Sequence, residues 1–338
     1  MCYNDIVEIR PTVEKCKRGV IMSKALLGAA LVAGGAFTAC MAGAETLFNR
    51  TIPRQDTLRV DLNEMADMSK WEEYKKFIVP KREWLESKEL EHVTVTARDG
   101  VELHADYFPA ESPSNKLVIC NHGYTGRGMK DCASIAVFFH RIGYDCLLVD
   151  HRGHGNSGGD YIGFGILDRY DCQKWIEYID RRFEKSKQIV LYGVSMGATT
   201  VIMTSAFADL SDSVKAVIAD CAFTSPYDVF KHILKRDYHL PAFPIMNIND
   251  SLCRKKAGYG FSDYSTLDAV RETDVPILFI HGKEDNFVPL YMTKQNYEAC
   301  RSEKEIMLVE NAGHGASYYE NPQAYEEKIE NFTKKYIV

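Results

Sequence analysis

Residues 193–197, with the sequence GVSMG, constrain the fold of this chain more than any other stretch. An apolar, β-prone run at 188–192 precedes them, and a run of small and apolar residues at 198–203 follows and can start a helix. A G-x-S-x-G turn between a strand and a helix is typical of a nucleophile elbow, which raises the serine hydroxyl above the sheet edge. Glycines on both sides let neighbouring chain pass close to the backbone. The alternative is an ordinary glycine-rich turn, which the flanking patterns disfavour.

Short apolar runs alternate with helical patterns along the rest of the chain. The runs that suit buried strands are residues 117–120, 146–149, 214–219, 276–280 and 305–309, and helical patterns cover 133–141, 166–183 and 322–336. This alternation predicts an α/β fold with a mainly parallel sheet and helices on both faces. Two alternating, β-branched segments flank Asp99 and Gly100, and they predict an antiparallel hairpin at one sheet edge.

A serine nucleophile needs a histidine to take its proton and a buried carboxylate to orient that histidine. In a parallel α/β sheet, such residues lie beyond the carboxyl ends of the strands. Asp285 and His314 each lie on a loop that follows a predicted strand. We therefore predict a catalytic triad of Ser195, Asp285 and His314, in that chain order. Glu284 is the alternative acid, and it is ranked lower because it is nearer the strand end.

Two backbone amides are candidates for an oxyanion hole, which needs two preorganised donors. One is the Met196 amide, directly after the serine, and the other is the Tyr124 amide, in the loop after strand 117–120. The alternative for this loop is a simple packing turn. His122 is expected to support the loop. His151 and His154 could form a metal pair, but loop-stabilising hydrogen bonds are favoured because no third ligand is visible.

Composition excludes several other classes of protein. The net charge is −6 and no long basic block occurs, so nucleic-acid binding is not expected. The ten cysteines include no C-x-x-C pair and no Cys/His cluster at metal-ligand spacing, so we expect neither a metal nor another cofactor. Cys120, Cys146 and Cys221 fall in or beside apolar runs and are interpreted as small buried hydrophobic residues.

Residues 1–44 are predicted to be an N-terminal extension with a signal anchor or signal peptide. The uncharged stretch 25–44 is long enough to span a bilayer as a helix, and Lys24 favours a cytoplasmic N-terminus. A cleaved signal peptide ending at the A-x-A sequence 42–44, a lipoprotein signal ending at Cys40, and an ordinary buried helix are the alternatives. We favour the anchor, which predicts a membrane-anchored protein, whereas a cleaved signal peptide predicts a secreted one. Either signal predicts an extracytoplasmic catalytic domain.

Residues 45–90 are predicted to be a helical bridge that packs on the body of the domain. Trp71, Phe77 and Trp84 recur in it at roughly helical spacing. The domain that follows is predicted to span residues 91–338.

The chain from about residue 91 onward resembles the α/β-hydrolase superfamily. The segments that carry the resemblance are 122–124, 150–157, 193–197, 281–285 and 313–314. It looks most like bacterial, membrane-anchored serine hydrolases of the cinnamoyl-ester-hydrolase-like and serine-aminopeptidase-like kinds. This resemblance implies an eight-stranded, mostly parallel sheet with an antiparallel second strand and a lid-like insert after strand six, here residues 222–270. The aromatic residues of the insert suit an apolar acyl or aryl pocket, or equally a small core of the insert itself.

The site residues lead us to expect a serine hydrolase that cleaves carboxylic esters through an acyl-enzyme on Ser195. The expected partner is a small-molecule acyl ester or amide. A serine peptidase, an aminopeptidase or an acyltransferase would use the same triad and stays open as an alternative. A non-catalytic binding protein is disfavoured because no member of the triad is missing.

Overall fold

The computed structural model describes residues 38, 40–54 and 68–338. Backbone contacts divide the chain into two compact units, residues 1–42 and residues 43–338. The second unit therefore groups most of the predicted bridge, 45–90, with the predicted hydrolase domain.

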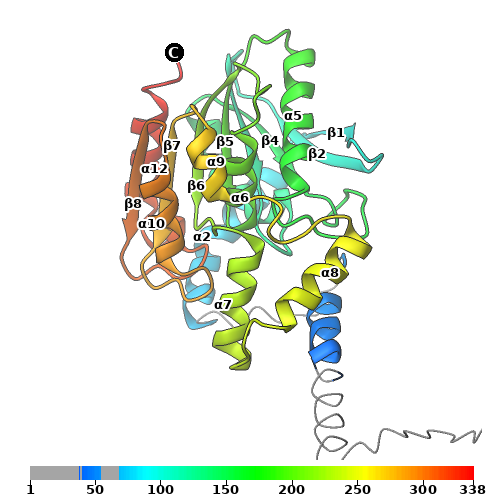
Figure 1. Cartoon of the computed structure of the whole chain (residues 1–338). Helices are drawn as coiled ribbons and strands as arrows, with labels where there is room; N and C mark the ends of the chain where they lie inside the picture. The colour runs from blue at the N-terminus through cyan, green and yellow to red at the C-terminus, as the bar shows by residue number, and fades with distance from the viewer. Residues whose placement is uncertain (1–37, 39, 55–67) are drawn as a thin grey trace, which may run out of the picture. The chain divides into compact units, whose positions relative to one another are not determined.

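One eight-stranded sheet organises the second unit (Figure 1). Its strands are β1 (Glu91–Thr96), β2 (Glu102–Phe108), β3 (Lys116–Asn121), β4 (Asp145–Val149), β5 (Gln188–Val194), β6 (Val214–Asp220), β7 (Ile277–Gly282) and β8 (Lys304–Val309). The spatial order is β1-β2-β4-β3-β5-β6-β7-β8, with β1 and β8 at opposite edges. Strand β2 pairs antiparallel with both of its neighbours and all other pairs are parallel, which confirms the predicted sheet.

Helices cover both faces of the sheet. They are α2 (Met68–Glu86), α3 (Gly128–Asp131), α4 (Ala133–Arg141), α5 (Asp168–Arg182), α6 (Met196–Thr204), α9 (Thr266–Glu272), α10 (Leu290–Ala299), α11 (Ser317–Glu320) and α12 (Pro322–Thr333). Side chains of α2, α4 and α12 form one core with the sheet, while α5, α6, α9 and α10 pack beside one another. Because both faces are covered, the central strands are continuous apolar runs, as in buried parallel sheets.

The connection from β6 to β7 holds two further helices, α7 (Pro226–Tyr238) and α8 (Ile245–Ala257), which extend from one end of the sheet (Figure 1). The predicted insert, 222–270, also included the start of α9, but α9 packs beside α6 and α10 as part of a helical layer. Some aromatic residues of the insert form a small core, as one of the two interpretations expects. Tyr259 and Phe261 are buried, whereas Phe243 is 75% exposed.

A helix over residues 40–51 belongs mostly to the second unit. Phe48 and Ile52 are buried, and the Ile162 amide donates to the Ile52 carbonyl, so this segment is bound to the domain by backbone and side chains. Most of the predicted membrane segment, 25–44, lies outside the described residues. Within the described part of the chain, no helix is long and apolar enough to cross a bilayer.

Candidate active site

Ser195 lies at the sharp turn between β5 and α6. Its backbone has φ 55° and ψ −114°, a left-handed conformation that side-chain-bearing residues rarely adopt. The Ser195 amide donates to the Asp220 carbonyl over 2.8 Å, which fixes the turn to the neighbouring strand β6. The surrounding structure holds this strained backbone in place, and it therefore positions the Ser195 side chain above the carboxyl end of β5.

The two glycines of the elbow are required by close approach of backbone. A Cβ atom on Gly193 would lie 2.3 Å from the carbonyl carbon of Gly197. A Cβ atom on Gly197 would lie 2.1 Å from the Asn121 carbonyl oxygen at the end of β3. The start of α6 can therefore pass against β3 only without side chains at these positions.

We expect Gly197→Ala to lower the free energy of unfolding by about 1–3 kcal/mol or more, because the methyl group must displace the backbone of residue 121. Gly313→Ala is the matched control, since a Cβ atom there meets no atom within 4 Å and the residue adjoins His314. Its effect should stay within about 0.5 kcal/mol. Urea unfolding of both variants measures the difference. Equal stabilities would contradict the steric explanation.

A chain of hydrogen bonds joins the three residues of the predicted triad. The Nε2 atom of His314 lies 2.9 Å from Ser195 Oγ, and its Nδ1 atom lies 2.8 Å from Asp285 Oδ2. The structure thus brings together side chains that are far apart in sequence, each from a loop at the carboxyl end of a strand. The alternative acid, Glu284, is exposed.

Asp285 is buried and held as a hydrogen-bond acceptor. Its Oδ1 atom accepts from the amides of Phe287 and Val288, at 2.9 and 2.8 Å. Burial by itself would raise the pKa of Asp285, but the adjacent His314, together with His281 and the Val288 amide, holds that pKa below its ordinary value. The carboxyl group is therefore ionised at neutral pH, as the partner of a histidine that must become an imidazolium requires.

His281 supports the loop that carries Asp285, a role that we did not predict from the sequence. Its Nε2–H donates to the Val288 carbonyl over 2.9 Å, and its Nδ1 accepts from the Thr293 hydroxyl over 2.8 Å. Its place at the end of β7, before a loop with an acidic residue, was the only signal in the sequence.

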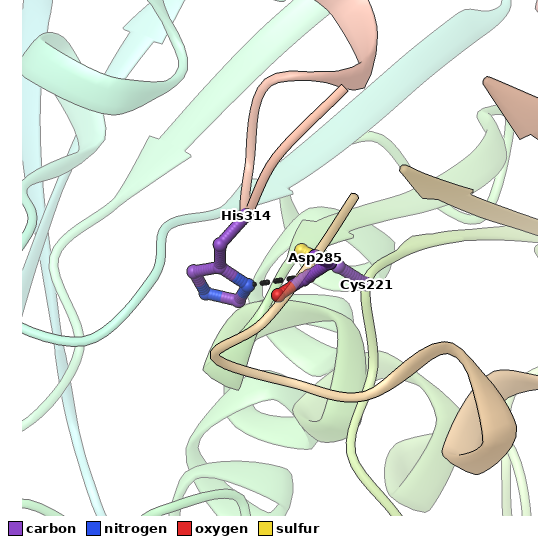
Figure 2. Close-up of side chains that lie close together, drawn as sticks. All are labelled: Cys221, Asp285 and His314. Atoms are coloured by element: carbon purple, nitrogen blue, oxygen red, sulfur yellow. Dashed lines mark hydrogen bonds and ion pairs between the residues drawn. The ribbon is translucent and has the colours of Figure 1, made fainter. Parts of the chain in front are cut away.

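Cys221 lies close to both Asp285 and His314 (Figure 2). Metal-ligand atoms of Cys221, Asp285 and His314 lie within 4.8 Å of one another. Burial raises the pKa of the Cys221 thiol well above its usual value, so it is a neutral thiol. The other two side chains are already hydrogen bonded to each other. The three side chains are therefore better explained as a hydrogen-bonded Asp285–His314 pair next to a neutral thiol than as a metal site.

Loop 121–126, the predicted source of an oxyanion donor, passes beside the serine. A Cβ atom on Gly123 would lie 3.6 Å from that of Ser195. The amide of Tyr124 follows in this loop, and the amide of Met196 begins α6. Within the described part of the chain, neither amide donates to a protein acceptor. Both amides therefore remain candidates for the predicted oxyanion hole.

Two buried histidines hold this loop on either side of Tyr124. The Nδ1–H of His122 donates to the Gly123 carbonyl over 2.6 Å. The Nε2 atom of His154 accepts from the Thr125 amide over 3.1 Å, and its Nδ1–H donates to the Arg152 carbonyl over 3.0 Å. Both ring nitrogens of His122 and of His154 bind backbone groups, as the loop-supporting interpretation expects. The ring of His151, the other member of the conceivable metal pair, lies with Nδ1 3.5 Å from the buried Asp168 carboxylate.

The burial of His154 predicts that folding stability depends on pH. Burial, reinforced by the neighbouring His122, lowers the pKa of His154 to about 3. As pH falls below about 6.5, His154 becomes protonated in the unfolded chain but stays neutral in the folded chain. The free energy of unfolding therefore falls. We expect wild type to lose roughly 2 kcal/mol relative to the non-titrating variant His154→Gln between pH 7 and pH 5, from ~1.5 pH units at ~1.36 kcal/mol each. Denaturant unfolding of both proteins at the two pH values tests this. A stability difference that does not change with pH would contradict it.

The fold and the site define an α/β-hydrolase: a serine on a nucleophile elbow, with a histidine and an aspartate from the loops after β8 and β7. Residues 131–338 match the prolyl oligopeptidase family, and the chain belongs to that family. Ser195, Asp285 and His314 all lie within the matched residues.

The chain is similar to uncharacterized proteins from other organisms and to a solved esterase structure. The uncharacterized protein YqkD of Bacillus subtilis is 31% identical over 224 residues, which cover 66% of this chain and 72% of YqkD. The uncharacterized membrane protein YNL320W of Saccharomyces cerevisiae is 28% identical over 63% of this chain and 68% of its own length. The solved structure of the Pyrococcus furiosus esterase Pf2001 shares the fold, with a TM-score of 0.59 and 21% identity over 75% of this chain and 92% of that chain.

Proposed function

We propose that this protein is a serine hydrolase that cleaves carboxylic esters through an acyl-enzyme on Ser195. The observation that carries the proposal is the hydrogen-bond chain from Ser195 through His314 to Asp285. A serine hydroxyl is a weak nucleophile at neutral pH, and a histidine within hydrogen-bond reach is the usual means of activating it.

In the proposed mechanism, Ser195 Oγ attacks the ester carbonyl carbon while His314 Nε2 takes the hydroxyl proton. The resulting oxyanion accepts hydrogen bonds from the Tyr124 and Met196 amides. Collapse breaks the bond to the alcohol oxygen, which leaves with the proton from His314. Water then attacks the acyl-enzyme by the same route, releases the acid and restores the Ser195 hydroxyl. Asp285 keeps Nδ1 of the imidazole protonated throughout.

A fluorophosphonate probe tests the nucleophile. Wild type should be labelled covalently, because the Ser195 oxygen attacks the probe phosphorus and displaces fluoride while His314 takes the hydroxyl proton, and Ser195→Ala should not be labelled. Labelling of both proteins to the same extent would remove Ser195 from the mechanism.

A serine peptidase is the second candidate, because the family to which the chain belongs is named for oligopeptidases. The same triad can cleave ester and amide bonds. The two bonds differ in their leaving group, which is an alcohol for an ester and an amine for an amide. Rates of p-nitrophenol release from acyl esters and of p-nitroaniline release from aminoacyl amides separate them. The ester proposal expects kcat/KM at least tenfold higher for the esters, and higher rates on the aminoacyl amides would favour the peptidase. Added alcohols that divert the acyl group would reveal an acyltransferase.

The location of the chain is part of the proposal. The apolar residues 25–44 support attachment to a membrane, with the catalytic unit on the extracytoplasmic side. The description of the relative YNL320W as a membrane protein supports it as well. Alkaline carbonate extraction should leave the full chain in the membrane pellet. Recovery of a soluble chain that begins near residue 45 would instead indicate a cleaved signal peptide.

A further inference from the structure

A cavity of about 1120 Å³ lies beside the site. Its walls come from the helix over 40–51, from α7 and the α7–α8 turn, and from loops next to the triad. Pockets that bind drug-sized molecules usually measure about 300–1,000 Å³, so this cavity is large enough for a larger ligand.

The cavity reaches the reacting groups from two sides. Tyr124, whose amide is the proposed oxyanion donor, is one lining residue, and Phe287 is another. The Phe287 ring centroid lies 4.9 Å from that of His314. The Tyr124 hydroxyl donates to the Thr51 carbonyl over 3.1 Å, which links loop 121–126 to the wall formed by the helix over 40–51. The cavity therefore extends to residues that adjoin the triad, with Phe287 against the His314 ring and Tyr124 in the loop beside Ser195.

The walls are mostly apolar. The Tyr124 ring packs on Phe164 at 5.1 Å, and Phe164 packs on the buried Phe230 at 4.9 Å, so a row of aromatic rings leads away from loop 121–126. Of the charged residues in the lining, Arg236 pairs with Asp237 over 2.8 Å, and Arg50 comes from the helix over 40–51. Such a surface favours hydrocarbon over charged or peptide-like groups.

The mouth of the cavity is also apolar. Tyr238 and Leu240 both line the cavity and are 50% and 42% exposed, so they lie at its rim, and the exposed Phe243 follows in the same turn. Gly43 lines the cavity from the other wall. In sequence, Gly43 directly follows the uncharged, apolar residues 25–42. Exposed apolar groups around an opening are typical of a surface that contacts lipid or a partner.

We propose that the cavity binds the long acyl chain of a lipid-like ester and that this ester enters from a lipid surface at the α7–α8 turn. The inference rests on the proposed function, because the ester carbonyl must reach Ser195. Membrane attachment through residues 25–44 would tether the catalytic unit to a bilayer, where such esters are concentrated.

The ligand class is tested with p-nitrophenyl esters from acetate to dodecanoate and the full-length chain. We expect kcat/KM to rise with acyl length. Ile233→Trp and Leu47→Trp fill the cavity from opposite walls, and each should lower the dodecanoate-to-acetate ratio of kcat/KM at least tenfold. Lys231→Trp places the same side chain on the exposed face of α7 and should leave the ratio within twofold. An optimum at acetate, or ratios unchanged in both cavity variants, would overturn the inference.

The source of the ester is tested by presenting the same dodecanoate ester either as monomers in solution or within phosphatidylcholine vesicles. We expect Phe243→Ser to slow turnover of the vesicle-bound ester at least fivefold and to leave monomer turnover unchanged. Equal rates for wild type and variant on vesicles would overturn the lipid-surface step. Failure of the proposed function looks different, since it would abolish acetate hydrolysis and fluorophosphonate labelling in wild type.

Discussion

Replacing Ser195 with alanine is expected to lower kcat for ester hydrolysis by roughly 10⁴- to 10⁶-fold while the protein stays folded. The Oγ atom lies 2.9 Å from His314 Nε2, and no other hydroxyl is hydrogen bonded to that nitrogen in the described part of the chain. Residual catalysis would come from binding and from the Tyr124 and Met196 amides alone. Steady-state hydrolysis of a p-nitrophenyl ester measures the loss, and a decrease of less than tenfold would contradict the proposed nucleophile.

Ser195→Gly is the matched variant, because it removes the same hydroxyl and also the backbone strain. With φ at 55°, a residue with a Cβ atom is strained here, whereas glycine is not. Ser195→Gly should therefore be as inactive as Ser195→Ala but more stable by about 1 kcal/mol. Thermal unfolding of the two inactive variants checks this, and equal midpoints would show that the elbow stores no strain.

The elements that could be predicted from the sequence are those in which local pattern and burial agree. Helices cover the central strands on both faces, so each strand is a continuous apolar run in the sequence. The elbow between β5 and α6 can be predicted because glycines lie on both sides of Ser195. Because parallel strands end at one sheet edge, the loops bearing Asp285 and His314 could be assigned to the same site before any distance was known.

The walls of the cavity could not be predicted, because they depend on contacts between distant segments. Nothing in the local sequence indicates that Tyr124 binds the helix over 40–51, or that Phe230 contacts Phe164 while Phe243 stays exposed. For the same reason the support given by His281 could not be predicted, since the sequence alone does not distinguish a buried histidine from an exposed one. The hydrophobic pattern of a sequence predicts which residues are buried, but only the tertiary structure shows which residues they pack against.

Asp285→Asn is expected to lower kcat by about 10⁴-fold, even though the new side chain has the same shape. Oδ1 of Asp285 accepts from the Phe287 and Val288 amides, so an asparagine must keep its carbonyl oxygen there and turn its NH₂ group toward His314. An NH₂ group donates to Nδ1, which forces the imidazole proton onto Nε2. The histidine then cannot accept the Ser195 proton, because Nε2 is the atom 2.9 Å from Oγ.

Glu284→Gln is the control for this prediction, because it removes one negative charge from the adjacent, exposed position. It should change kcat less than twofold, since an exposed charge interacts weakly through water. A pronounced loss in Glu284→Gln together with an active Asp285→Asn would exchange the roles of the two acids. If both variants were active, the histidine would need no acid, and the hydrogen bond between His314 and Asp285 would serve only to hold the loop after β8 against the loop after β7.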